Sequence, residues 1–246
     1  MRAIGIDVGG SGVKAALVDV AAGEFVGDRV RVDTPQPATP DAVVSAAREL
    51  IAGFPSDLPV GVGFPAPVID GVTTTAANVD AGWVGAPAAE LFTRGLGRPV
   101  VVVNDADAAG VGEARHGAAR DVPGVVLLLT LGTGIGSALI NDGVLVPNTE
   151  LGHLQVRGHD AEHLAAAAVR DDEGLSWHEW AARLSEVIGA MDALLWPDLV
   201  LLGGGVSRKS DKFIPLLDVR PPVRPAALRN RAGIIGAACL AADAAA

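Results

Sequence analysis

Short apolar runs alternate with polar and glycine-rich segments along the chain. Runs rich in Val, Leu and Ile and bounded by turn residues are typical of buried strands, and they occur at 4–7, 58–64, 100–103, 125–130 and 198–202. Apolar residues at helical spacing predict helices at 40–52, 86–96, 106–116, 177–195 and 231–246. Strands that alternate with helices indicate an α/β protein.

The first hairpin is predicted from residues 4–19. An apolar strand ends near Asp7, a glycine-rich tip follows, and alternation from Val13 to Asp19 predicts a second strand. Walker and Rossmann loops are excluded, because each of them opens a helix. Backbone N–H groups at such a tip can hold an anion, and Asp7 can hold a hydrated Mg²⁺ beside it. An ordinary tight hairpin is the alternative. The candidate phosphate-binding residues are Gly9, Gly10, Ser11, Gly12 and Lys14.

The strand–tip–strand layout recurs 123 positions later. This offset aligns Asp7 with Thr130, Gly9 with Gly132, Ala15 with Ala138 and Asp19 with Asp142. An internal duplication predicts two lobes: residues 1–103 plus 232–246, and residues 104–231, with the active site in the cleft between them. Two further candidate phosphate cradles are Gly132, Thr133 and Gly134, and the strand end Gly203, Gly204 and Gly205.

Two local patterns complete the predicted elements. Residues 24–33 have the pattern of a third strand. Ser176 and Glu179 form a capping box at the start of the longest helix. Helical spacing places these apolar residues on one face of that helix: Trp177, Trp180, Ala181, Leu184, Val187, Ile188, Met191, Leu194 and Leu195.

Composition narrows the functional classes. The chain has 246 residues, half of them hydrophobic, and a single cysteine, Cys239, so a disulfide framework and a cysteine-based zinc site are excluded. We expect a cytoplasmic protein, because the sequence has neither a signal peptide nor a long apolar stretch. A net charge of −10 argues against nucleic-acid binding.

The charge is unevenly distributed. Residues 203–234, here called the basic island, carry two acidic side chains and these basic ones: Arg208, Lys209, Lys212, Arg220, Arg224, Arg229 and Arg231. This island is either a site for an anionic ligand or a solvated surface.

Phosphoryl transfer needs a base for the acceptor hydroxyl. Asp105 follows a buried strand beside Asn104 and is the best candidate, although a helix N-cap would also suit this position. Glu150 and His153 could hold sugar hydroxyls together with Asn104. Alternatively, they are structural or form a partial metal site, for which His159 and His163 would be the further ligands.

Together these motifs resemble the ROK family of sugar kinases (repressor, open reading frame, kinase), within the actin-like ATPase superfamily. The resemblance is strongest to the polyphosphate glucokinase branch. It covers nearly the whole chain, in the segments 7–14, 76–80 with Trp83, 104–110, 130–136, 147–153, 174–177, 203–207 and 212–215. Pro147-Asn-Thr-Glu-Leu-Gly-His153 and Gly174-Leu-Ser-Trp177 are its most specific parts.

The resemblance implies a two-lobed, actin-like (ribonuclease H-like) duplicated fold. It also implies that Asp105 is the catalytic base acting on the sugar 6-hydroxyl. Substrate-binding residues would be Asn104, Glu150, His153, Glu162 and Asn78. Three features depart from the family pattern: the cysteine-rich zinc loop is missing, Ala66 replaces a glycine, and Ala81 stands where the branch often has lysine.

The expected function is therefore phosphorylation of glucose with polyphosphate, ATP or both, with Mg²⁺ and without zinc. We expect a homodimer that binds neither nucleic acid nor a membrane. Two alternatives remain: a strictly ATP-dependent hexokinase, and a non-catalytic sugar-binding regulator.

Overall fold

The computed structural model describes residues 1–76 and 79–246, which form two compact units. Unit 1 comprises residues 1–116 and 231–246, and unit 2 comprises residues 117–230. The boundaries expected at 103/104 and 231/232 differ from these mainly by one helix, α3 (Asp105–His116), which belongs to unit 1.

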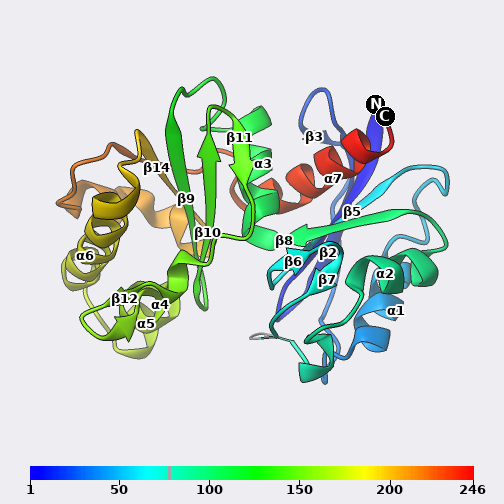
Figure 1. Ribbon diagram of the computed structural model, residues 1–246, viewed down its shortest axis with the longest axis horizontal. Helices are drawn as coiled ribbons and strands as arrows, with labels where there is room; N and C mark the ends of the chain where they lie inside the picture. The colour runs from blue at the N-terminus through cyan, green and yellow to red at the C-terminus, as the bar shows by residue number, and fades with distance from the viewer. Residues whose placement is uncertain (77–78) are drawn as a thin grey trace. The chain divides into compact units, whose positions relative to one another are not determined.

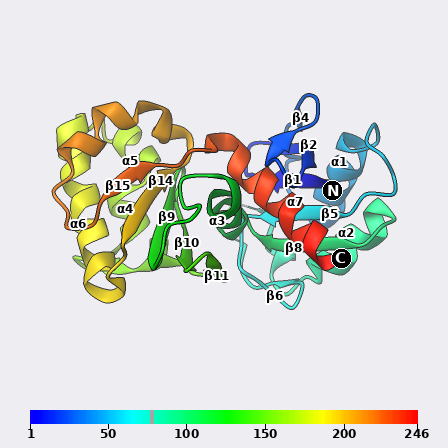
Figure 2. The same ribbon diagram turned by 90° about the horizontal axis from the view of Figure 1, so that it is seen from above.

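Unit 1 is a mixed sheet with helices on both faces (Figures 1 and 2). Its strands are β1 (Arg2–Val8), β2 (Val13–Asp19), β3 (Glu24–Phe25), β4 (Val30–Val32), β5 (Val60–Phe64), β6 (Val68–Ile69), β7 (Val72–Thr73) and β8 (Val100–Asn104). Its helices are α1 (Pro40–Leu50), α2 (Ala88–Leu96), α3, α7 (Ala232–Ala244) and the 3₁₀ turn η1 (Ala81–Trp83). The sheet order is β3-β2-β1-β5-β8, with β4 also paired to β2.

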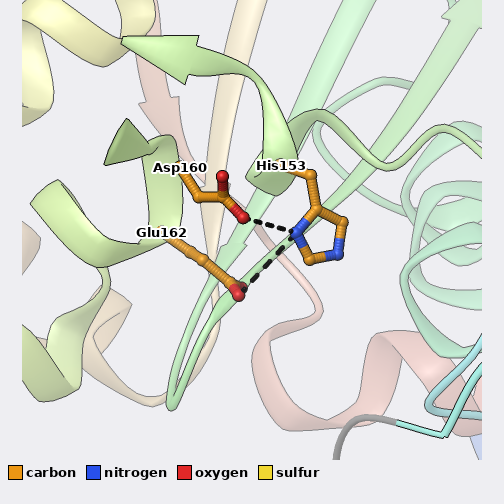
Figure 3. A group of neighbouring side chains, drawn as sticks. All are labelled: His153, Asp160 and Glu162. Atoms are coloured by element: carbon orange, nitrogen blue, oxygen red, sulfur yellow. Dashed lines mark hydrogen bonds and ion pairs between the residues drawn. The ribbon is translucent and has the colours of Figure 1, made fainter. Parts of the chain in front are cut away.

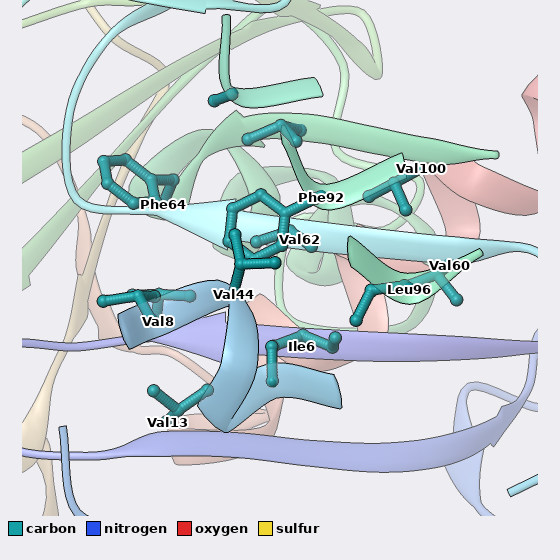
Figure 4. Packing of buried hydrophobic residues seen from close by; sticks show 14 of the residues in the cluster. Ile6, Val8, Val13, Val44, Val60, Val62, Phe64, Phe92, Leu96 and Val100 are labelled. Atoms are coloured by element: carbon teal, nitrogen blue, oxygen red, sulfur yellow. The ribbon is translucent and has the colours of Figure 1, made fainter. Parts of the chain in front are cut away.

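Alternation along β1 explains the two faces of this sheet. Ile4 and Ile6 point into a core shared with α1 and α2, where Val44, Phe92 and Leu96 pack against the strands (Figure 4). Gly5 points to the other face, where a Cβ would lie 1.9 Å from the carbonyl oxygen of Ile234 in α7. The glycine in the strand therefore lets α7 lie directly on the sheet.

Helix α3 packs equally closely on α7. A Cβ on Gly236 would lie 1.7 Å from the carbonyl oxygen of Ala108, so a larger residue there would force the two helices apart. This contact explains why α3 belongs to unit 1. The C-terminal helix α7 likewise packs on the β1 and β5 strands of unit 1.

Unit 2 repeats the layout with its own sheet. Its strands are β9 (Val125–Leu131), β10 (Ile135–Asn141), β11 (Val144–Val146), β12 (Gln155–Val156), β13 (His159–Asp160), β14 (Leu199–Gly203) and β15 (Val223–Pro225). Its helices are α4 (Ala161–Ala165), α5 (Ala167–Asp172) and α6 (Trp177–Leu195), with 3₁₀ segments η2 (Leu151–His153), η3 (Gly205–Lys212) and η4 (Ile214–Leu216). A last turn, η5 (Arg229–Arg231), joins the units.

The two principal sheets have matching topologies. The unit 2 order β11-β10-β9-β14-β15 corresponds strand for strand to β3-β2-β1-β5-β8, with the same antiparallel and parallel pairings. The internal duplication is thus confirmed. The offset of 123 holds up to the tip, but the second tip is one residue shorter. Lys14 corresponds to Gly136, so the matches of Ala15 with Ala138 and Asp19 with Asp142 are wrong by one residue.

Two local expectations also need correction. Residues 24–33 form two short strands rather than one, because the backbone turns at Gly27, whose φ is +84°. On α6 the capping box is present and Trp180 is fully buried, as predicted, but the Leu194 side chain is 65% exposed. Leu194 lies in the last turn at the margin of the apolar face, where the core no longer covers it. Among the described residues, no helix combines the length and apolar character needed to cross a bilayer.

Candidate active site

The first glycine tip carries a paired charge. Asp7 and Lys14 lie opposite each other on β1 and β2, and Lys14 Nζ donates to Asp7 Oδ2 over 3.0 Å. Gly9 N–H donates to the Gly12 carbonyl and closes the tip. Arg31 on β4 donates to the Ser11 carbonyl at 3.0 Å, which adds a second cation to the tip. Both cations have carboxylate partners, Lys14 in Asp7 and Arg31 in Asp33 at 2.8 Å, so an anion at the tip would be held chiefly by backbone N–H groups.

Asn104 and Asp105 lie at the junction of β8 and α3. The Asn104 side chain caps the helix, since its Oδ1 accepts from the N–H groups of Ala106 (2.8 Å) and Asp107 (3.0 Å). The capping role considered for Asp105 is thus performed by Asn104. A Cβ on Gly233 would lie 3.8 Å from both the Asp105 carbonyl oxygen and Asp7 Oδ1. Unit 1 therefore brings the Asp7 carboxylate and the Asp105 backbone to one place at the carboxyl ends of parallel strands.

The second glycine tip, in unit 2, has no such charged pair in its strands. Thr130 and Gly136 occupy the register positions of Asp7 and Lys14. Instead, the Glu162 carboxylate reaches the tip from α4, and its Oε2 accepts from the Ile135 N–H at 3.3 Å. A Cβ on Gly134 would lie 2.3 Å from Glu162 Oε2. A larger residue there would require the Glu162 carboxylate to move away from the tip.

The loop that carries Glu150 is held against β10. The Ser137 hydroxyl donates to the Thr149 carbonyl at 2.6 Å and accepts from the Leu151 N–H at 3.0 Å. Burial raises the pKa of the Glu150 carboxyl, and the nearby Glu162 carboxylate adds to this effect, whereas His153 opposes it.

His153, Asp160 and Glu162 form a cluster whose ligand atoms all lie within 4.8 Å of one another (Figure 3). His153 Nδ1 is 3.1 Å from Asp160 Oδ2 and 4.0 Å from Glu162 Oε1. The hydrogen bond from His153 lowers the pKa of the Asp160 carboxyl, with a smaller contribution from Gln155. Because a carboxylate oxygen only accepts, Nδ1 carries the hydrogen of this bond. Such a cluster can bind hydroxyl groups or a cation.

The third glycine segment lies beside the second within unit 2. Gly203 pairs with Thr130 across β14 and β9. Gly132 and Gly205 both line a pocket of about 370 Å³, together with Thr133, Arg170, Trp177 and Lys209. Two of the three expected cradles therefore converge in one pocket.

The basic island does not act as one surface. Arg220 donates from Nε to the Asp192 carboxylate at 3.0 Å, donates from Nη2 to the Pro197 carbonyl, and lies over the Trp196 ring. Lys209 instead lies 5.7 Å from the centre of the Trp177 ring. The cations of the island therefore face different surroundings.

The structure groups the predicted residues by unit. Asp7, Asn104 and Asp105 belong to unit 1, and the Glu150, His153 and Glu162 set belongs to unit 2. Asn78 lies outside the described residues. Sequence reasoning missed Arg31, Asp160 and Arg170. Asp160 could have been found from its spacing, two residues before Glu162, whereas Arg31 and Arg170 depend on strand pairing and helix packing.

Three comparisons with known proteins agree with this geometry. A model of the ROK family matches residues 3–173. A polyphosphate glucokinase of Mycobacterium tuberculosis (strain CDC 1551 / Oshkosh) is 51% identical over 235 residues, which cover 95% of this chain and 89% of that protein. The solved inorganic polyphosphate/ATP-glucomannokinase of Arthrobacter sp. strain KM is 49% identical, covers 99% of both chains and has a TM-score of 0.96.

A ROK family glucokinase from Streptomyces griseus, solved with glucose and AMPPNP, is 26% identical with a TM-score of 0.85 over 99% of this chain and all of that one. These neighbours confirm the predicted two-lobed, actin-like fold. With a matching family model over most of its length, a duplicated sheet and the expected motifs at the strand ends, this chain belongs to the ROK family.

Proposed function

We propose that this protein is a glucokinase that transfers the terminal phosphoryl group of polyphosphate or ATP to the 6-hydroxyl of glucose. The observation that supports the proposal is the strand-end geometry of unit 1, where the Asp105 backbone carbonyl and Asp7 Oδ1 both lie near Gly233 and the Asn104 side chain caps helix α3. The names of the relatives at 51% and 49% identity support the same activity.

Asp105 acts as the base. Its carboxylate accepts the proton of the 6-hydroxyl while that oxygen attacks the terminal phosphorus. The bond from phosphorus to the bridging oxygen breaks, and the shortened donor leaves with the electron pair. Since little covalent chemistry falls to the protein, positioning and charge stabilisation supply most of the catalysis.

Mg²⁺ is the proposed metal, and the residues present suit it. Mg²⁺ prefers oxygen ligands and is usually bound through one or two carboxylates, several waters and substrate phosphates. Asp7 offers such a carboxylate at a strand end, with Lys14 on its Oδ2 and with Oδ1 on the side of Gly233. When bound, the ion would neutralise charge on the transferring phosphoryl group.

The sugar hydroxyls are assigned to the polar side chains that the motifs named. Asn104 would donate from its amide, because its Oδ1 already accepts two backbone bonds. Glu150 and Glu162 would accept, and His153 would accept at Nε2 while Asp160 holds Nδ1. Asn78 is kept in the proposal on its motif alone.

The donor is assigned to the three glycine segments, 9–12, 132–134 and 203–205. An ATP-dependent hexokinase remains the first alternative, since the neighbour from Streptomyces griseus was solved with AMPPNP. A non-catalytic sugar-binding regulator remains the second, and it would bind glucose without turnover.

The deciding experiment measures glucose 6-phosphate formation with polyphosphate and with ATP at equal concentrations of transferable phosphoryl groups, each with and without Mg²⁺. We expect product with polyphosphate and none without the metal. Product with ATP alone would favour the hexokinase alternative. Glucose binding without product from either donor would contradict the proposal and favour the regulator.

We further propose a homodimer in the cytoplasm. Val144 and Val146 on the edge strand β11 are 68% and 42% exposed, and an exposed apolar edge strand favours association. The single cysteine is typical of chains that do not depend on disulfides. Light scattering of the purified protein tests the dimer, and Val144→Lys should yield a monomer if β11 is the interface.

A further inference from the structure

The pocket of unit 2 contains a stack that the proposed function does not use. The Arg170 guanidinium carbon lies 3.7 Å from the centre of the Trp177 ring, and Lys209 Nζ lies 5.7 Å from the same centre. All three side chains line the pocket with Gly132, Thr133 and Gly205. Two cations thus share one indole next to two glycine segments.

Packing fixes the position of the stack. The Ala168 N–H on α5 donates to the Gly132 carbonyl at 3.1 Å, which ties the helix of Arg170 to the glycine tip. Trp177 starts α6 behind a capping box and packs against Trp180 and Phe213. The guanidinium therefore rests on a rigid aromatic surface.

The charges around the stack are not balanced. Arg170 has one acidic partner, Asp171, at 2.7 Å, and that carboxylate is 75% exposed. The Arg170 side chain is only 20% exposed, and its buried Nε has no hydrogen-bond partner among the described residues. Two cations with one screened carboxylate repel each other, and an anion in the pocket would relieve this repulsion.

The stack also distinguishes between kinds of anion. A nucleobase can stack directly on an indole, at about 3.5 Å, only where that ring face is uncovered. Arg170 occupies that position on Trp177. Beside apolar side chains such as Leu131 and Val206, the lining offers a ligand the two glycine segments and the cations Arg170 and Lys209, which can hold a chain of phosphates.

We propose that Arg170, held on Trp177 and assisted by Lys209, selects polyphosphate over ATP as the phosphoryl donor. This inference rests on the proposed function and adds residues that determine which donor is used. Arg170 contacts a distal phosphate of the donor, and its guanidinium excludes an adenine ring from the indole.

The test is a comparison of donors in the full-length protein. Arg170→Ala should raise the KM for polyphosphate about tenfold or more, the loss expected for one charge-assisted hydrogen bond. The KM for ATP should stay unchanged or fall, because the indole is uncovered. Arg170→Lys keeps the charge but loses the planar group, so it should restore only part of the polyphosphate affinity.

The matched control is Arg183→Ala on α6. Arg183 is paired with Glu173 at 2.7 Å and does not line the pocket, so its loss should change neither KM. Trp177→Leu should act through Arg170, so that adding it to Arg170→Ala raises the KM for polyphosphate no further.

The outcomes separate the two proposals. If wild-type protein uses polyphosphate and Arg170→Ala leaves its KM unchanged, or raises the KM for both donors equally, the selectivity inference is overturned. If the wild type forms no glucose 6-phosphate from either donor, the proposed function itself fails. Should Arg170→Ala not fold, Arg170→Lys still decides: a polyphosphate KM equal to that of the wild type overturns the inference.

Discussion

The two units have the same sheet order but carry different chemistry at the same position. In unit 1 the residues beside the tip are Asp7 and Lys14, which form an ion pair, whereas in unit 2 they are Thr130 and Gly136. Unit 2 brings its carboxylate, Glu162, from a helix outside the sheet. The duplicated frame thus carries its charged groups at different places in the two units.

The largest loss of turnover is expected from a substitution at the β8–α3 junction of unit 1, and no substitution in unit 2 should reduce turnover as much. Asp105→Asn keeps the size of the side chain and removes its basicity, so turnover should fall by about 10²–10⁴, the usual contribution of a general base. Glucose affinity should change little, and isothermal titration provides that control. A variant that keeps more than half of wild-type turnover would contradict the assignment.

The next largest effect is expected at the first glycine tip, and the equivalent position in the second tip provides the comparison. Asp7→Asn should lower turnover roughly 10–100-fold and raise the Mg²⁺ concentration needed for half-maximal rate, as loss of a group that orients a metal's waters does. Thr130→Val, at the equivalent position, should leave the Mg²⁺ dependence unchanged. Equal responses of the two variants would mean that the tips are not specialised in this way.

Glu150 provides a smaller effect with a defined pH dependence. Glu150→Gln should raise the KM for glucose roughly 5–100-fold, because a hydroxyl loses a charged acceptor. Burial raises the pKa of Glu150, so in the wild type this KM should rise on acidification before an ordinary glutamate would protonate. The variant should lack that rise.

The same shift predicts the sign of the stability change. A folded pKa above the unfolded one stabilises the protein at low pH, and this contribution is lost as pH rises through the folded value. Glu150→Gln should therefore keep or raise the melting temperature at neutral pH. If His153→Ala instead binds glucose normally but loses a bound metal by elemental analysis, the cluster of His153, Asp160 and Glu162 is a metal site.

The smallest effect concerns two glycines in one tip. Gly134→Ala would place a Cβ 2.3 Å from Glu162 Oε2, so we expect destabilisation of about 1–3 kcal/mol and a weaker glucose interaction. Gly132→Ala is the matched control, since no described atom outside its neighbours lies within 4 Å of a Cβ there. Denaturant titration compares the two, and equal stability would show that Glu162 moves freely.

Sequence patterns predicted the elements that local physics determines. The Ser176 capping box and the two hairpins appear as expected, because each depends on residues close in the chain. The offset beyond the second tip failed, since a one-residue difference in loop length leaves no local signal. The glycine segments named by motif lie at strand ends and in turns, whereas Glu162 lies on helix α4.

The remaining features of the site could not be predicted, because they depend on contacts between segments that are far apart in the sequence. Asn and Asp are both common N-cap residues, so residue type alone does not tell which of Asn104 and Asp105 caps α3. The hydrogen bonds that Ala106 and Asp107 donate to the Asn104 side chain show that Asn104 is the cap. Arg170 carries no motif, and its importance arises from the contact of α5 with Trp177. Such contacts join segments whose order in the chain does not indicate their distance in space.

The return of α7 to unit 1 has a consequence for biosynthesis. Unit 2 is one continuous stretch of chain, but unit 1 needs residues 231–246, which the ribosome makes after all of unit 2. We expect unit 2 to reach its native state first. Until α7 is made, the face of β1 and β5 on which it packs stays exposed to solvent. Limited proteolysis of chains arrested before and after α7 would reveal that order, with unit 1 becoming resistant only after the helix has left the exit tunnel.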